Sequence, residues 1–448
     1  MNQPTSEAES PALGQSAPRQ DLPTPLLVVG LVLVALGLWL RIWGYEQPAG
    51  FTFDEHHFVE NARNYLKGVP DWNDHPPLGK LTEAAAMRAL DDSARAWRLP
   101  ALLSGLGIVA LAGLLAHKIF RSCWAALFAA ALIACDGFFI AYSRTGLLDG
   151  QLVFFTLAST YAVVGAPRRA HFFFAGVLAG AAASIKMSGV AALGPVFLAV
   201  LLDRSRATFI SLGLAFVAFL VVYWADWHLG LALTHRLDAN AWSETSRLMT
   251  HHAALTSMDN GLTSSWPTWF FPRRPIVMTW SEERAYVRMA TTMGNPLVWW
   301  ATSATVLGLL GLVCWKGVRQ TLAKPTAVEP TVTEPTATEP TATAIERSSF
   351  LDRHGRAVIF LLTGFLAFLA PWMLTRRDPY IYHYLPCYAY GVILLGGLLA
   401  WLAERQRRFV LLALCSVLVV SAFYAPVWAR LPTTNTGVRA RLFLESWR

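Results

Sequence analysis

Long apolar runs, separated by short polar connections, dominate the chain. A helix that crosses a membrane needs about 20 mostly apolar residues. We therefore predict an all-α polytopic membrane protein with about eleven transmembrane helices. The runs lie near residues 26–44, 99–116, 123–142, 152–166, 172–188, 189–202, 207–226, 297–315, 357–374, 380–401 and 409–427.

Lys and Arg predict the orientation, because cytoplasmic loops of membrane proteins carry an excess of both. With the N-terminus in the cytoplasm, every connection that falls inside holds at least two of them. These connections are 117–121, 167–170, 203–206, 316–356 and 404–408. The long segments 45–98 and 227–296 then face outward, with amphipathic helices expected in the first.

The chain divides into four regions by composition. Residues 1–24 are predicted to form a disordered cytoplasmic tail. Residues 25–316 form the transmembrane core and its outer loops, beginning with a run that we expect to be retained rather than cleaved. Residues 317–356 form a cytoplasmic linker with a Pro/Thr/Glu repeat, and residues 357–448 hold the last transmembrane helices and an outer tail.

Composition excludes several classes of protein. Only 15% of residues are charged and 54% are hydrophobic, which fits neither a disordered chain nor an ordinary soluble domain. The net charge of +8 is explained by loops facing anionic lipid, so no nucleic-acid partner is expected. The five cysteines lie in or beside apolar runs and suggest neither a disulfide framework nor a metal site.

Polar residues gather just after the first run. Adjacent carboxylates, Asp54 and Glu55, begin a stretch whose pattern predicts an amphipathic helix as far as Leu66. A second helix can start after Pro77. Asp54 could simply cap the first helix. Acid, imidazole and ammonium groups at one membrane interface also suit general-base chemistry on an anionic substrate.

Further polar clusters fall on the same predicted side of the membrane. Arg144 and Asp149 flank one turn, Lys186 lies at another, and Arg377 precedes a third. Each could be a snorkelling side chain or part of a helix-end salt bridge. Their convergence favours a lipid phosphate bound at the outer rim, with a base beside it.

The quoted residues resemble the dolichyl-phosphate-mannose protein O-mannosyltransferase family, over about residues 45–395. The most specific element is the string from Asp74 to Lys80, DHPPLGK. The resemblance implies a GT-C fold of the bacterial branch, because the second long loop is too short for a β-trefoil domain. The other elements are Asp54-Glu55 with His57-Phe58, Ser143-Arg144 with Leu148-Asp149, His383-Tyr384-Leu385-Pro386 and, more loosely, Ser265–Trp269.

The resemblance implies transfer of mannose from a polyprenyl-phosphate carrier to Ser or Thr hydroxyls of secreted or membrane proteins, with inversion. Asp54 would be the base and Glu55 a positioning group. Such an enzyme would work at the outer face of a bacterial inner membrane and would need no cofactor besides its lipid-linked donor. The implied phosphate ligands are Arg144, Lys80, Lys186 and Arg377, the supporting residues are His57, Asp74, His75, Asp149, His383 and Tyr384, and the acceptor loop holds Trp266 and Trp269.

Two other functions and a metal site remain open from the sequence. A related transferase, similar to the aminoarabinose enzymes, would modify a glycolipid or polysaccharide. A lipid-sugar transporter would show inverted repeats and mid-membrane charges, and the sequence shows neither. A metal site is conceivable from the acids and imidazoles of the first loop. However, His56 and His57 are neighbours on a predicted helix and should point to different faces.

Overall fold

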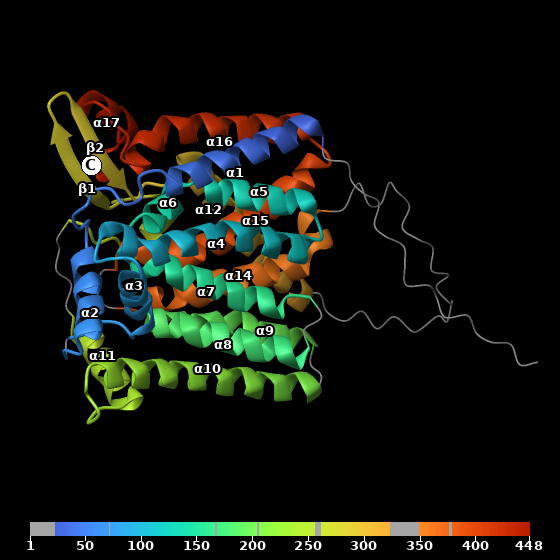
Figure 1. The fold of residues 1–448 in the computed structure, drawn as a ribbon. Helices are drawn as coiled ribbons and strands as arrows, with labels where there is room; N and C mark the ends of the chain where they lie inside the picture. The colour runs from blue at the N-terminus through green and yellow to red at the C-terminus, as the bar shows by residue number, and fades with distance from the viewer. Residues whose placement is uncertain are drawn as a thin grey trace, which may run out of the picture.

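A bundle of long, roughly parallel helices forms the body of the protein (Figure 1). The computed structural model describes residues 23–70, 72–165, 168–203, 206–255, 261–322, 349–375 and 379–448. The predicted tail, the Pro/Thr/Glu repeat and Arg377 lie largely or wholly outside these ranges.

The first half of the chain supplies the helices up to α10. They are α1 (Thr24–Ile42), α2 (Glu55–Lys67), α3 (Leu78–Ala89), α4 (Ala94–Phe120), α5 (Cys123–Ala134), α6 (Gly137–Ser143), α7 (Leu148–Val163), α8 (Arg169–Ile185), the 3-10 helix η1 (Met187–Ala192), α9 (Leu193–Asp203) and α10 (Arg206–Leu233).

The second half adds a small hairpin and the remaining helices. They are α11 (Ala241–Ala254), η2 (Trp266–Phe270), β1 (Val277–Glu283), β2 (Tyr286–Thr291), α12 (Pro296–Leu322), α14 (Phe350–Leu374), η3 (Ile381–Tyr384), α15 (Leu385–Ala403), α16 (Arg407–Trp428), α17 (Asn435–Arg441) and η4 (Glu445–Trp447).

The predicted helical membrane protein is confirmed, and all eleven apolar runs fall on helices. Within the described residues, seven helices are long and apolar enough to span a membrane, or eight if the bent pair α5–α6 is one span. Helices α7, α8 and η1–α9 are shorter than a full span. The number eleven therefore stays a prediction.

Burial distinguishes the centre of the bundle from its periphery. About 83% of the span that includes α15 is buried, against 28% for α10. Helix α10 exposes large apolar side chains such as Phe209, Phe216 and Val221, as expected for a helix that faces lipid. The core therefore forms around α15, which packs against α5, α12 and α14.

One end of the bundle carries α2, α3, α11, the hairpin and α17, and we call it the loop end (Figure 1). The antiparallel strands β1 and β2 were not predicted from the sequence. The hairpin is bridged to the segment after α16 through Val287 and Thr433. This contact joins the second long loop to the C-terminal tail.

The bend between α5 and α6, at 67°, is stabilised by polar side chains. Asp136 caps α6 by accepting a hydrogen bond from the Phe138 N–H, and its other oxygen accepts from Tyr388 and from the Asn295 N–H. Arg41 of α1, which is fully buried, donates to the carbonyls of Ile133 and Ala134 at the end of α5. A broken helix in a membrane requires such partners for its freed backbone groups.

Helices α1 and α5 approach so closely at Gly37 that no side chain fits there. A Cβ at this position would lie 2.1 Å from the carbonyl oxygen of Ala134. We expect Gly37→Ala to lower the free energy of unfolding by about 1–3 kcal/mol, because the two backbones must separate. Thermal unfolding of the detergent-solubilised protein would measure it. Gly213→Ala on α10 is the matched control, since a Cβ there meets nothing within 4 Å; equal effects would contradict the packing argument.

Candidate active site

Glu55, the first residue of α2, is fully buried and anchors the loop end. Arg98 of α4 donates two hydrogen bonds to its carboxylate, of 2.7 and 2.8 Å. The backbone N–H groups of Thr52 and Gly146 donate to the same carboxylate at 2.8 and 2.7 Å. Both carboxylate oxygens are therefore fully engaged, and the side chain ties α2 to α4 and to the turn before α7.

Asp54 is its neighbour in sequence but has a different environment. It occupies the N-cap position of α2, yet its side chain makes no capping hydrogen bond. Burial raises the pKa of Asp54, and the negative charge of Asp149 adds to this rise. The positive charges of His57, Lys186 and His56 lower the pKa of Asp54 in part. A half-buried carboxylate that is not needed for capping is suited to accept a proton.

Lys186 contacts two other parts of the chain at this place. Its Nζ lies 2.8 and 2.9 Å from the two carboxylate oxygens of Asp149, at the start of α7. The same Nζ lies 4.9 Å from the centre of the Tyr382 ring, in η3. Lys186 itself stands at the break between α8 and η1. The charge of Lys186 also acts on the pKa of Asp54 and of His75, which places both groups within electrostatic range of it.

Imidazole and aromatic rings complete this site. His75 stacks between Phe58 and His252, with ring centroids 6.0 and 5.9 Å away. Burial lowers the pKa of His75, and the nearby charges of Lys186 and Lys80 lower it further, which favours the neutral imidazole. On the side of η3, the His383 ring lies 4.4 Å from that of Tyr382.

Lys80 and Asp74 fix the loop that carries His75. The Lys80 ammonium group is buried and donates to the Asn73 side chain and to the His75 carbonyl. Burial lowers the pKa of Lys80 to about 7. Asp74 is exposed and faces α11, where it lies 3.7 Å from His251. In this geometry both residues position a loop, and the expected phosphate-binding role of Lys80 stays a prediction.

Arg144 is also engaged by the protein itself. Its guanidinium donates to the carbonyls of Leu40, Trp43 and Gly44 at 2.7, 2.6 and 2.8 Å, and reaches Ala429 at 3.4 Å. It thus binds the carbonyl ends of α1 and α16, where a positive charge is favourable. The sequence analysis expected this residue to bind phosphate, and that role stays a prediction.

The remaining predicted residues differ in their access to the site. Trp269 and Tyr384 are completely buried and pack against each other, with ring centroids 5.9 Å apart. Trp266 is only partly buried. The expectation that His56 and His57 point to different faces is wrong, because their ring centroids lie 3.7 Å apart. Within the described ranges, no three His, Cys, Asp or Glu side chains gather in a way that could hold a metal ion.

Several buried charged residues were missed by the sequence analysis. Arg98 directly precedes an apolar run, and this position was the signal that it might be buried. Asp226, near the end of α10, accepts a hydrogen bond from the Leu78 N–H and so caps α3 from another helix. Glu83 on α3 is fully buried. Only the tertiary structure reveals these contacts, since their partners are distant in sequence.

Comparison with known proteins places this arrangement in a family. The family model described as dolichyl-phosphate-mannose-protein mannosyltransferase matches residues 74–227. The model described as the C-terminal four-transmembrane region of protein-O-mannosyltransferase matches residues 237–447. Together they cover most of the chain. It belongs to the protein O-mannosyltransferase family. The predicted family and enzyme class, a glycosyltransferase of GT-C fold, are thereby confirmed.

Relatives of the whole chain agree with this assignment. The polyprenol-phosphate-mannose–protein mannosyltransferase of Mycobacterium tuberculosis is 24% identical over 94% of this chain and 92% of that protein. The Saccharomyces cerevisiae Pmt1–Pmt2 protein O-mannosyltransferase complex bound to the sugar donor has a chain that matches with a TM-score of 0.76 and 14% identity. That match covers 96% of this chain and 93% of the other. ArnT from Cupriavidus metallidurans, bound to undecaprenyl phosphate, matches less well, with a TM-score of 0.54, 17% identity, and coverage of 93% and 67%.

The buried pair of Glu55 and Arg98 yields a stability prediction for this mannosyltransferase-family chain. Arg98→Met should lower the free energy of unfolding by about 3–5 kcal/mol, because it leaves a buried carboxylate without its counter-charge. Denaturant unfolding in detergent would measure the loss. The partly exposed pair of Arg353 and Glu404 provides the control, and Arg353→Met should cost less than about 1 kcal/mol. Similar losses in the two variants would contradict an anchoring role for Arg98.

Proposed function

We propose that this protein transfers mannose from a polyprenyl-phosphate carrier to Ser or Thr hydroxyls of proteins, with inversion at the sugar carbon. The convergence of Asp54, Lys186 and Asp149 at the loop end carries this proposal. The family membership and the whole-length relative support the choice of donor and acceptor. The loop end would face away from the cytoplasm, as the distribution of Lys and Arg predicts.

In the proposed reaction, the acceptor hydroxyl attacks the anomeric carbon of the donor. Asp54 accepts the proton from this hydroxyl as the new carbon–oxygen bond forms. The bond between the anomeric carbon and the phosphate oxygen breaks, and the polyprenyl phosphate leaves with the electron pair. One base suffices, because the phosphate is already a good leaving group and needs charge neutralisation rather than a strong acid.

Lys186 is the cation best placed to supply this neutralisation. Its charge reaches Asp54, whereas the donors of Arg144 and Lys80 are engaged by backbone carbonyls and by Asn73. Asp149 would hold the ammonium group in position until the phosphate arrives. Tyr382 would provide one wall of the site, below Lys186.

Asp54→Asn tests the base directly. The variant should fold normally, because the side chain makes no capping hydrogen bond, and should lose at least about 100-fold in transfer rate. The assay would offer polyprenyl-phosphate-mannose with a Ser/Thr peptide and, in parallel, a glycolipid acceptor. Glu60→Gln, an exposed carboxylate of the same helix, is the control and should stay active. Near-normal rates in Asp54→Asn would show that Asp54 is not the base. Transfer to the glycolipid alone would contradict a protein acceptor.

The pH profile provides an independent measurement. Because burial raises the pKa of Asp54, the acid limb of kcat/KM should lie above the ordinary aspartate value of about 3.9. Protonated His57 lowers the pKa of Asp54, together with Lys186 and His56, while Asp149 raises it. His57→Gln should therefore move the acid limb to higher pH. Asp149→Asn should move it to lower pH; shifts in the same direction would contradict Asp54 as the titrating group.

A further inference from the structure

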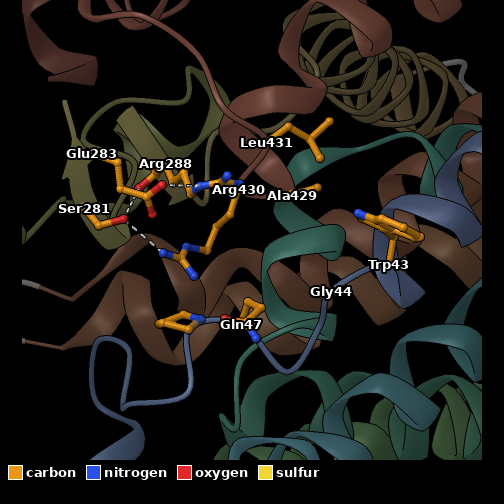
Figure 2. A pocket seen from close by; sticks show the side chains of 10 residues that line it. Trp43, Gly44, Gln47, Ser281, Glu283, Arg288, Ala429, Arg430 and Leu431 are labelled. Atoms are coloured by element: carbon orange, nitrogen blue, oxygen red, sulfur yellow. Dashed lines mark hydrogen bonds and ion pairs between the residues drawn. The ribbon is translucent and has the colours of Figure 1, made fainter. Parts of the chain in front are cut away.

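A cavity of about 580 Å³ lies at the loop end, and none of the residues assigned to the transfer reaction lines it. It opens between the end of α1, the β1–β2 hairpin and the turn that follows α16 (Figure 2). Gly44 and Pro48 line this cavity, and their carbonyl groups accept hydrogen bonds from Arg144 and Arg98. The wall of the cavity is therefore held by buried side chains, and Asp54 is not among the residues that line the cavity.

Two guanidinium groups reach into this cavity. Arg430 extends from the turn after α16 and donates to the Ser281 hydroxyl at 3.1 Å, and Arg288 lies 3.2 Å from the Glu283 carboxylate (Figure 2). The Nε of Arg430 is buried and has no hydrogen-bond partner in the described part of the chain. Burial and the like charges of Arg98 and Arg288 lower the pKa of Arg430, so an anion beside it would be stabilised.

A second cavity, of about 570 Å³, adjoins the first along the C-terminal end of α1. The two share Trp43, Gly44 and Gln47, and the second is lined in addition by Trp39, Ile42 and Glu46. The exposed rings of Trp39, on α1, and Trp43, directly after it, stack with centroids 6.0 Å apart, and α1 is a candidate span. Tryptophan at the end of a span marks the level of the lipid headgroups.

The charged residues that line the two cavities indicate which charged groups a ligand would carry. Arg288 and Arg430 balance Glu283 and Glu46, so the lining has no net charge. Guanidinium groups suit a phosphate, and the carboxylates suit an ammonium group. The pair of Arg288 and Glu283 is partly exposed, and pairs of this kind are weak enough to open for a ligand. A purely anionic lipid that drew Arg288 to its phosphate would leave Glu283 without a partner.

We propose that these joined cavities bind an aminophospholipid such as phosphatidylethanolamine. Its phosphate lies at Arg430 and Arg288, its ammonium group at Glu283, and its acyl chains run along Trp39 and Ile42. The lipid fills the space between α1, the hairpin and the C-terminal turn. This site is distinct from the donor site and does not depend on the proposed transferase activity.

Lipid retention tests the proposal. The full-length protein would be reconstituted in nanodiscs with equal amounts of phosphatidylethanolamine, phosphatidylglycerol and phosphatidylcholine. It would then be extracted into mild detergent and analysed by native mass spectrometry. Phosphatidylethanolamine should be retained in excess, and Arg430→Gln should reduce its retention by about tenfold, through the loss of a charge-assisted contact. The control is Arg439→Gln, an exposed arginine of α17 outside the cavities, which should not change retention.

A second variant keeps the test decisive if Arg430→Gln does not fold. Glu283→Gln alters an exposed carboxylate and should abolish the preference for phosphatidylethanolamine over phosphatidylglycerol. Equal retention of the three lipids by the unaltered protein, or a preference for phosphatidylglycerol, would overturn the proposal. Displacement of the lipid by inorganic phosphate alone would show a simple anion site, and displacement by a Ser/Thr peptide would show an acceptor site. Either result would also overturn it.

Discussion

The buried ion pair of Arg98 and Glu55 is the contact on which the candidate site depends. An ionised carboxylate can be taken out of water only if its oxygens find donors of sufficient strength, and Glu55 has four. The pair fixes the first turn of α2 against α4. Asp54, one residue earlier, is thereby held at the N-terminus of α2, although its side chain makes no capping hydrogen bond there. Two adjacent acids thus have separate tasks, one structural and one available for chemistry.

Buried arginines elsewhere at the loop end provide hydrogen-bond partners for the carbonyl groups of helix ends. Helices that end or bend inside a membrane protein expose carbonyl groups that water cannot reach. Arg41 binds the carbonyls at the end of α5, and Arg144 binds those at the ends of α1 and α16. The planar guanidinium suits this role, since one group can serve several carbonyls at once. These contacts give partners to buried carbonyl groups at the ends of three helices, in addition to the close packing of α1 against α5.

The sequence predicted the helical membrane fold well, because a spanning helix leaves a simple apolar signature. It also predicted that Asp54, Asp149, Lys186 and His383 belong to one region. In the structure, Lys186 contacts Asp149 and Tyr382, and Tyr382 lies beside His383. The charge of Lys186 acts on Asp54 as well. The number of spans was harder to predict, since α7, α8 and η1–α9 are apolar but short. The hairpin was missed because alternation over so few residues is easily hidden in a long polar loop.

The roles of the individual charges could not be predicted from the sequence. A sequence shows that Arg144 and Lys186 both stand at turns between helices, but not which of them finds backbone carbonyls and which finds a carboxylate. The same limit applies to Lys80, whose partners Asn73 and His75 are close in sequence yet meet it only because the loop folds back. Partner choice is decided by tertiary geometry, and it determines whether a cation is structural or available to a substrate.

The balance of charge around Asp54 also explains why Asp54 would be a weaker base while no donor is bound. Lys186 is neutralised by Asp149 while no donor is present, and its positive charge keeps the pKa of Asp54 from rising further. In the proposed reaction, a donor phosphate beside Lys186 brings negative charge close to Asp54. Negative charge nearby favours the protonated form of a carboxyl group, so it makes the carboxylate a stronger base. Binding of the donor would thus strengthen the base at the moment when an acceptor hydroxyl must be deprotonated.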